Sequence, residues 1–250
     1  MLQGGGIIPI SKNDFILVEY TTKVKETGEI IDTTNAEIAK ESKAYSPDKI
    51  YEPTLIIVGE GRYVEGFEEA LMKSDIGVES TVEVPPEKAY GPRDPNKVKV
   101  FSLRELVRAG ITPEPGKVIE IGGSLGTVRS VSGGRVLVDF NHPLAGKTLI
   151  FHFKILKRIE DPIEKIQALL HRRIKKLPPE KFIIKRQDEG KTIIIEVPKE
   201  VITDREIPII KALVAEEIFK YIEGVENVIY LDKFTKKKEE TRVEESSKKS

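Results

Sequence analysis

The chain has 250 residues, 39% of them hydrophobic and 33% charged, which is the composition of a globular protein with one large domain or two smaller ones. The 41 basic and 41 acidic residues cancel, so no bulk charge favours nucleic acid, and the lack of cysteine excludes disulfides, thiolate metal sites and cysteine nucleophiles. No apolar run is long enough to span a membrane, and the first residues show no secretory signal pattern, so we expect a cytoplasmic protein.

The first ninety residues are predicted to form short strands and one clear helix. Runs of apolar and β-branched residues that stop at glycine, proline or a turn predict strands at 15–20, 30–31, 54–58 and 81–84. A short helix is expected within 33–43. A second helix is expected over 64–72, because Val64, Phe67 and Leu71 repeat at the spacing of one helix face and acidic residues near its start suit the helix dipole.

The region from about residue 93 to 141 has a different pattern. Four prolines punctuate its first part, and a glycine pair marks a hairpin turn near its end. We expect a helical turn at 102–108 and strands at 118–121, 126–128 and 135–140. The unit looks inserted, because the strand expected over 148–155 needs a partner sheet and the first region supplies one.

A separate α+β domain of about seventy residues is predicted from Asp161 onward, where Asp161 and Pro162 mark a helix start. The expected elements are helices over 162–176 and 207–222 and strands near 182–186, 192–197 and 227–231. The second helix is more apolar than one sheet face requires, which predicts self-association through Ile209, Ile210, Leu213, Val214, Ile218 and Tyr221. The basic run at 171–176 is interpreted as a solvated helix face, with nucleic-acid binding as the less favoured alternative.

Motifs that suggest ligand-binding loops have simpler interpretations as turns. The Gly-Lys-Thr triplets at 146–148 and 190–192 precede strands, and Asn141 and Lys185 stand where a phosphate loop needs its first glycine. The three histidines have no carboxylate at ligand spacing, and no Gly-x-Ser-x-Gly nucleophile motif occurs. We therefore expect no metal and no cofactor.

A set of aromatic and aliphatic residues has two interpretations, as part of the hydrophobic core or as the lining of a binding pocket. For any single member the core is the simpler interpretation. Its members are Tyr20, Phe67, Tyr90 and Phe151, with Ile31, Val64 and Leu144. Two observations favour a pocket. Tyr90 lies between a proline pair and Gly91-Pro92, so it should occupy a loop at a sheet edge, and Asp32 places a carboxylate beside Ile31 in an otherwise apolar wall.

Three strings resemble the FKBP-type peptidyl-prolyl isomerases, in particular the SlyD-like branch and its long archaeal form; they span 64–71, 89–91 and 141–151. The resemblance covers about residues 13–160. It implies an α+β fold in which an antiparallel half-barrel sheet surrounds a short helix, with an inserted β-rich flap domain. The implied organisation is an isomerase domain at 1–92 and 142–160, an insert-in-flap domain at 93–141, a C-terminal α+β domain at 161–235 and a disordered charged tail at 236–250. Few glutamines and many Glu, Lys and Ile residues are typical of a thermophilic source.

The resemblance also implies roles for the pocket set. Phe67, often tryptophan in the family, would form the floor of a proline pocket, Tyr90 would donate a hydrogen bond to a substrate carbonyl, and Asp32 would be the wall carboxylate. The implied walls are Tyr20, Ile31, Val64, Leu144 and Phe151. The smaller ring at the floor makes binding of the family's macrolide inhibitors an open question. The tail lacks the histidines and cysteines of SlyD, so nickel binding is not transferred.

Catalysis of X–Pro rotation needs neither a nucleophile nor a metal, because a dry apolar pocket favours the twisted, less polar amide over the planar one. The expected partners are unfolded or partly folded proline-containing polypeptides. Apolar residues of the insert, such as Ile111, Val118, Ile119, Ile121, Val128 and Val131, would either hold such clients or form the insert's own core. The alternative function is a holdase or scaffold that binds proline segments without turnover.

Overall fold

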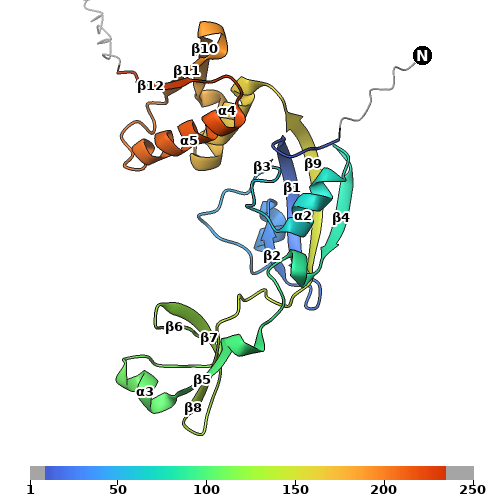
Figure 1. Cartoon of the computed structure of the whole chain (residues 1–250), viewed down its shortest axis with the longest axis vertical. Coiled ribbons are helices and arrows are strands. Elements are labelled where there is room, and N and C mark those ends of the chain that lie inside the picture. The colour runs from blue at the N-terminus through green and yellow to red at the C-terminus, as the bar shows by residue number, and fades with distance from the viewer. Residues whose placement is uncertain (1–8, 235–250) are drawn as a thin grey trace, which may run out of the picture. The chain divides into compact units, whose positions relative to one another are not determined.

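The computed structural model describes residues 9–234, so the tail expected at 236–250 lies outside the described residues. The chain divides into two compact units, Met1–Ile159 and Glu160–Ser250. The first unit contains two separate sheets and the second contains one (Figure 1). No helix among the described residues is long and apolar enough to cross a lipid bilayer.

A five-stranded antiparallel sheet forms the body of the first unit. Its strands are β1 (Phe15–Val24), β2 (Ile30–Thr33), β3 (Thr54–Ile57), β4 (Glu79–Val84) and β9 (Leu149–Ile159). The order is β2-β1-β9-β4, with β3 also paired to β1, so the strand that closes the unit runs through the middle of the sheet. The predicted strands are present, and β1 continues to Val24 because its buried alternation continues that far.

One face of this sheet is covered by helix α2 (Glu65–Met72), as Figure 1 shows. Phe67 and Leu71 on α2 enter a single core with the inward-facing residues of β1 and β9, which are Ile16, Val18, Tyr20, Val24, Leu149, Phe151, Phe153 and Ile155. A second, shorter helix, α1 (Ala36–Lys40), begins at Asn35, whose side chain accepts two backbone N–H groups. The predicted antiparallel sheet around a short helix is confirmed.

A four-stranded sheet lies between β4 and β9 in the sequence. Its strands are β5 (Val98–Ser102), β6 (Val118–Ile121), β7 (Ser124–Ser132) and β8 (Arg135–Asp139), in the order β5-β8-β7-β6. The expected helical turn is present as helix α3 (Leu103–Arg108), which is capped by Ser102. Its Leu106 joins a small core with Ile119, Val128, Val136 and Val138. Strand β5 was missed, because it is a short run directly after the prolines and its hydrogen-bonding partner β8 is distant in the sequence.

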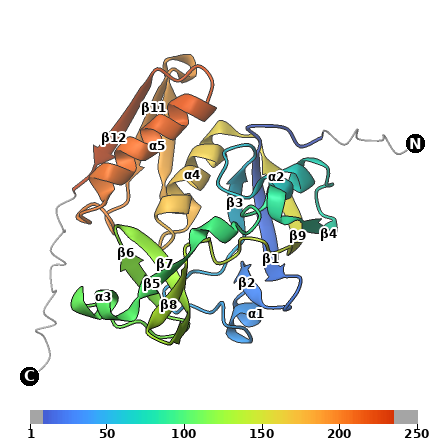
Figure 2. The ribbon, with the colours of Figure 1, turned by 60° about the horizontal axis from the view of Figure 1, so that its bottom comes forward.

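The second unit packs two helices with a three-stranded sheet. The elements are α4 (Pro162–Arg173), β10 (Ile183–Gln187), β11 (Thr192–Val197), α5 (Ile207–Tyr221) and β12 (Asn227–Asp232) (Figure 2). Strands β10 and β11 are antiparallel, and α5 connects β11 to a parallel β12. Short 3₁₀ helices occur in both units. Those of the first unit are η1 (Pro86–Lys88) and η2 (Pro95–Lys97), and those of the second are η3 (Pro179–Lys181) and η4 (Asp188–Gly190).

The basic run at 171–176 has a structural use in this unit. Arg172 and Arg173 on α4 both form ion pairs with Glu217 on α5, and Lys176 forms an ion pair with Asp204. The arginine contacts connect the two helices, and the Lys176 contact joins the segments that flank them. The prediction of a solvated helix face is therefore wrong for Arg172 and Arg173, whose side chains are only 10% and 20% exposed because they pair with Glu217.

Candidate functional site

An aromatic cluster lies between α2 and the five-stranded sheet. The Phe67 ring, which is 0% exposed, stacks on the Phe151 ring with centroids 4.2 Å apart and planes inclined by 10°. Phe153, Tyr63 and Tyr20 surround it with inclined ring planes at 5.2, 5.7 and 5.9 Å. Such pairs are favourable because the edge of one ring meets the face of the next. The structure therefore brings Phe67, Tyr20 and Phe151 together, and it places Phe67 inside the core.

Gly66 sets how close α2 lies to the neighbouring strand. A Cβ atom added at Gly66 would lie 2.5 Å from Cγ1 of Val84 in β4 and 3.2 Å from Cβ of Lys88. Only a residue without a side chain permits this approach. The glycine thereby fixes the depth at which the neighbouring Phe67 ring enters the cluster.

Glu68 holds the turn that leads from β3 to α2. Its buried carboxylate accepts the backbone N–H groups of Gly59 and Gly61, at 3.0 and 3.2 Å. Both glycines have positive φ, 79° and 78°, which other residues rarely adopt. Sequence reasoning assigned Glu68 to the helix dipole and missed this contact, because the acceptor and its donors belong to different elements.

Half-buried apolar side chains surround this cluster. Ile31, Val64 and Leu144 all pack against the hydrophobic core to which these rings belong, together with Tyr63. They come from β2, from the N-cap position of α2 and from the segment before β9. Tyr63 was not predicted, although its place directly before Val64 was a signal. The result is a partly exposed apolar surface backed by stacked rings.

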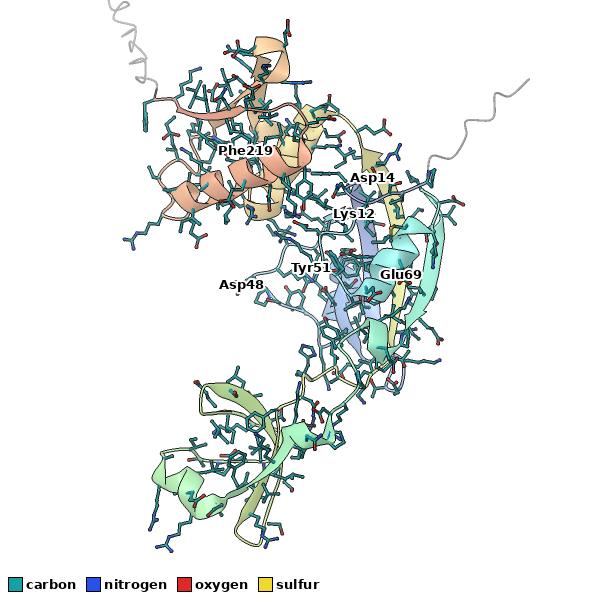
Figure 3. All side chains as sticks on the ribbon, in the orientation of Figure 1. Lys12, Asp14, Asp48, Tyr51, Glu69 and Phe219 are labelled. Atoms are coloured by element: carbon teal, nitrogen blue, oxygen red, sulfur yellow. The ribbon has the colours of Figure 1, made fainter. Side chains whose placement is uncertain are left out.

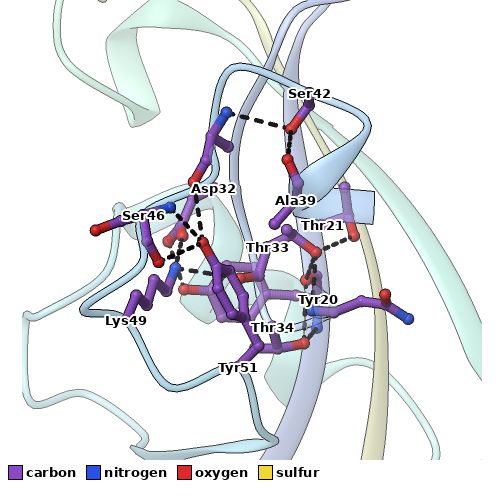
Figure 4. Close-up of polar contacts among 12 residues, drawn as sticks. Tyr20, Thr21, Asp32, Thr33, Thr34, Ala39, Ser42, Ser46, Lys49 and Tyr51 are labelled. Carbon is purple, nitrogen blue, oxygen red and sulfur yellow. Dashed lines mark hydrogen bonds and ion pairs between the residues drawn. The ribbon is translucent and has the colours of Figure 1, made fainter. Parts of the chain in front are cut away.

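Asp32 lies at one side of this surface with both carboxylate oxygens engaged (Figure 4). The Tyr20 hydroxyl donates to Oδ2 at 2.6 Å, and Lys49 forms an ion pair with Oδ1 and donates to the Thr33 carbonyl at 3.1 Å. Burial raises the pKa of Tyr20, and the neighbouring Tyr63 and Asp32 raise it further. The phenol therefore stays protonated at neutral pH and remains a donor to Asp32.

Lys49 is held against Asp32 by its own loop, which spans residues 41–53. The Lys49 ammonium lies 5.3 Å from the centroid of the Tyr51 ring. The Tyr51 hydroxyl accepts the Ser46 N–H at 2.8 Å, and Tyr45 stacks on Tyr51 at 6.0 Å (Figures 3 and 4). Sequence reasoning missed Lys49 because this contact spans 17 residues of chain and is made by a loop.

Tyr90 lies apart from the aromatic cluster. It follows η1, is 43% exposed, and its ring stacks on His142 with centroids 4.2 Å apart and planes inclined by 5°. Nδ1 of His142 accepts the Leu144 N–H at 3.2 Å. Since Leu144 packs against the cluster, the Tyr90–His142 pair is connected to its edge.

Three family models match successive parts of the chain. Residues 8–107 match the FKBP-type peptidyl-prolyl cis-trans isomerase model, residues 99–144 match the model described as FKBP26, IF domain, and residues 162–235 match the one described as FKBP26 C-terminal. A short-type peptidyl-prolyl cis-trans isomerase of Methanocaldococcus jannaschii is 41% identical over 146 residues, which cover 58% of this chain and 92% of that protein. The chain belongs to the FKBP-type peptidyl-prolyl cis-trans isomerase family.

Bacterial relatives give the same result. A FKBP-type 16 kDa peptidyl-prolyl cis-trans isomerase of Escherichia coli K12 is 31% identical over 153 residues, 59% of this chain and 93% of that protein. SlyD of Helicobacter pylori is 32% identical over 165 residues, 62% of this chain and 78% of that protein. The resemblance to the SlyD-like branch is therefore confirmed. The chain is a peptidyl-prolyl isomerase, and its substrates are polypeptides that contain X–Pro bonds.

The other face of the five-stranded sheet carries a hollow of about 550 Å³. Of the predicted site residues only Tyr20 lines it, and its other walls include Glu19, Thr81, His152 and Lys154. Within residues 9–234 no group of three or more His, Cys, Asp or Glu side chains is placed to hold a metal ion.

Proposed function

We propose that this FKBP isomerase binds the proline ring against the half-buried side chains of Ile31, Val64 and Leu144 and stabilises the twisted amide without covalent chemistry. The planar X–Pro amide is separated from its isomer by a barrier of about 18–20 kcal/mol. Its carbonyl is less polar when it is twisted out of conjugation, so an apolar surface that excludes water favours the twisted state. The observation that carries the proposal is the apolar surface bounded by Asp32 and by the exposed Tyr90.

Phe67 supports this surface from behind. Because the ring has no exposed area, substrate meets the side chains that cover it, and the stacked pair of Phe67 and Phe151 holds those side chains in place. The Tyr90 hydroxyl can donate to a carbonyl next to proline, since His142 contacts Tyr90 by stacking on the face of its ring. The backbone amide of Val64, at the positive end of α2, is a second donor for the substrate.

The test is the refolding of a protein whose slow step is X–Pro isomerisation. Far less than one equivalent of the isomerase should accelerate it, and Tyr90→Phe and Val64→Ala should each lower kcat/KM. His152→Ala, on the opposite face of the sheet, is the matched control and should have no effect. If acceleration needed stoichiometric protein, the chain would act as a holdase. Equal activity of wild type and Tyr90→Phe would refute the role of the phenol.

We further propose that the insert holds unfolded clients on the open face of its sheet. Ile119 and Val128 form the insert's own core, whereas Val118 and Leu125 are 57% and 68% exposed, and Val100 on β5 is also exposed. The apolar residues thus divide between a core and a surface. An exposed apolar face on so small a sheet is typical of an interaction site.

Client binding is tested by the pair Val118→Ser and Leu125→Ser, introduced together. Catalysis of protein refolding should fall while activity on a short proline peptide stays unchanged, because the peptide is too short to reach the insert. Val107→Ser, an equally exposed valine on α3, serves as the control. Equal losses on both substrates would contradict the division of labour.

The C-terminal unit is proposed to mediate self-association through α5. Val214 and Ile218 are buried in their own unit, but Ile209, Leu213 and Phe219 remain exposed on the helix. Phe219 is labelled in Figure 3. Sedimentation of the full chain should give a dimer that Leu213→Glu converts to a monomer, with Ile183→Glu on β10 as the control. A monomeric wild-type chain would refute this proposal.

A further inference from the structure

The chain crosses twice between the isomerase sheet and the insert sheet, and one buried carboxylate lies at the crossing. We call residues 90–97 the outgoing segment and residues 140–147 the returning segment. Asp139 is the last residue of β8, and its side chain is 0% exposed. Its Oδ2 accepts from Arg93 at 3.2 and 2.7 Å and from Arg129 at 3.1 and 3.0 Å. Its Oδ1 accepts the backbone N–H and side-chain amide of Asn141, at 2.9 and 2.8 Å.

The two arginines come from different places. Arg93 belongs to the outgoing segment, whereas Arg129 lies within the insert on β7. The register of β7 against β8 shifts between Val128 and Ser130, so Arg129 is an extra residue in the strand. Such a bulge redirects a side chain, and here the guanidinium reaches Asp139. The Arg93 contact connects the end of β8 to the outgoing segment, and the Arg129 contact connects β8 to β7 within the insert sheet.

Backbone and amide contacts join the same two segments. Asn141 accepts the Asp94 N–H and donates to the Asp94 carbonyl, both at 2.9 Å. The Phe140 N–H donates to the Lys97 carbonyl at 3.0 Å, which continues the β5–β8 ladder beyond the sheet. The outgoing and returning segments are therefore held side by side up to their junction with the insert.

These contacts continue to the edge of the proposed proline site. The Gly146 N–H donates to the Gly91 carbonyl at 2.8 Å. Gly146 has a φ of 74°, and a Cβ atom there would lie 3.1 Å from Cβ of Arg93. The stacked rings of Tyr90 and His142 belong to the same two segments. A continuous set of contacts thus leads from Asp139 to the Tyr90 phenol.

The Asp139 carboxylate is charged at neutral pH. Burial raises the pKa of Asp139, but the hydrogen bonds from Asn141, Arg93 and Arg129 outweigh it and hold the pKa well below the ordinary range. A buried charge of this kind is tolerated only while its partners stay in place. Two half-exposed guanidinium groups on one oxygen make the contact specific for arginine geometry.

We propose that Asp139 and Arg93 form a clasp that fixes the orientation of the insert relative to the isomerase sheet, so that a client held by the insert presents its X–Pro bond to the proline site. Arg93 and Asp139 are positioning residues in this scheme and do not touch the reacting amide. The inference rests on the proposed holding of clients by the insert. Its physical basis is effective concentration, since a tethered segment meets the site more often when its holder does not tumble freely.

The decisive comparison is between Arg93→Ala and Arg129→Ala in the full chain. Each removes one guanidinium from the same oxygen of Asp139, but only the first removes a contact between Asp139 and the outgoing segment. Arg93→Ala should lower kcat/KM for refolding of a proline-limited protein by about tenfold. Activity on a short proline peptide should be unchanged in both variants, and Arg129→Ala should keep its refolding activity.

A second readout does not depend on client binding. Nitrogen-15 relaxation should show the insert and the isomerase sheet tumbling as one body in wild type and in Arg129→Ala. In Arg93→Ala the insert amides should report a shorter correlation time, with chemical shifts inside β6 and β7 unchanged. Arg93→Lys restores the charge and one donor and should recover part of both losses.

Each failure has its own signature. If Arg93→Ala and Arg129→Ala behave alike in refolding and in relaxation, the clasp is refuted while client holding by the insert stands. If deletion of residues 93–141 leaves refolding activity unchanged, client holding is refuted. If Arg93→Ala frees the insert without lowering refolding activity, fixed orientation is irrelevant to catalysis and the inference fails.

Discussion

The two antiparallel sheets of the first unit are stabilised in different ways. The isomerase sheet buries one face under α2 with aromatic rings that contact one another. The insert sheet has a core of five buried side chains, leaves apolar residues exposed, and places a buried charge where the chain leaves it. A site that must hold its shape is thus built on packing, whereas an inserted unit is attached through directional polar contacts.

The largest expected effect is confined to the isomerase sheet. Phe67→Ala removes a fully buried ring and should lower the free energy of unfolding of this sheet by about 3–5 kcal/mol. Leu106→Ala should destabilise the insert alone, by about 2–5 kcal/mol. Hydrogen exchange resolved by residue measures both. If either variant destabilised the two sheets equally, they would form one cooperative unit and the comparison would break down.

The second effect concerns the insert and depends on pH. Asp139→Asn keeps the shape of the side chain but loses charge-assisted hydrogen bonds, which should cost about 1.5–3 kcal/mol of insert stability at neutral pH. The folded-state pKa of Asp139 is depressed, so its stabilisation is present above its ordinary value of 3.8 and is lost as pH falls below it. The difference between wild type and Asp139→Asn should therefore be constant at neutral pH and shrink below about pH 3.8. A difference that grew in acid would contradict this assignment.

Two glycines sharpen the comparison at a smaller scale. A Cβ atom added at Gly66 would lie 2.5 Å from Cγ1 of Val84. A Cβ atom added at Gly126 on β7 would lie equally close to Cγ1 of Val138. Alanine at either position should cost about 1–3 kcal/mol by overpacking. Gly66→Ala should also lower peptide isomerase activity, because it displaces the aromatic cluster behind the proposed proline site. Gly126→Ala should leave that activity intact, as urea titrations and a peptide assay would show.

The smallest effect is expected at the Asp32 wall. Lys49→Ala removes an ion pair whose members are more than one third exposed, so unfolding should become easier by only about 0.2–1 kcal/mol. The Asp32 side chain should then become more mobile, with a modest loss of kcat/KM. Lys25→Ala breaks the similarly exposed pair with Glu83 and is the control for stability alone. A large loss of stability in Lys49→Ala would show that the 41–53 loop depends on this contact.

Local sequence was informative wherever a pattern repeated within one element. The spacing of Val64, Phe67 and Leu71 predicted α2, and runs of apolar and β-branched residues bounded by turns predicted β1, β9 and most of the insert strands. It failed at β5, a short run whose place in the sheet comes from pairing with β8. It also failed for Tyr63 and Glu68, whose roles depend on which element packs beside them.

The sequence by itself determined the element order and the family, because periodicity, turn residues and the strings at 64–71, 89–91 and 141–151 are local properties of the chain. Only the tertiary structure decided that the Phe67 ring is fully buried in the core, that Lys49 engages Asp32, and that Arg93 meets Asp139 across 46 residues. The physical reason is that the position of a ring or an ion pair between distant segments depends on how whole elements pack, which no local pattern encodes.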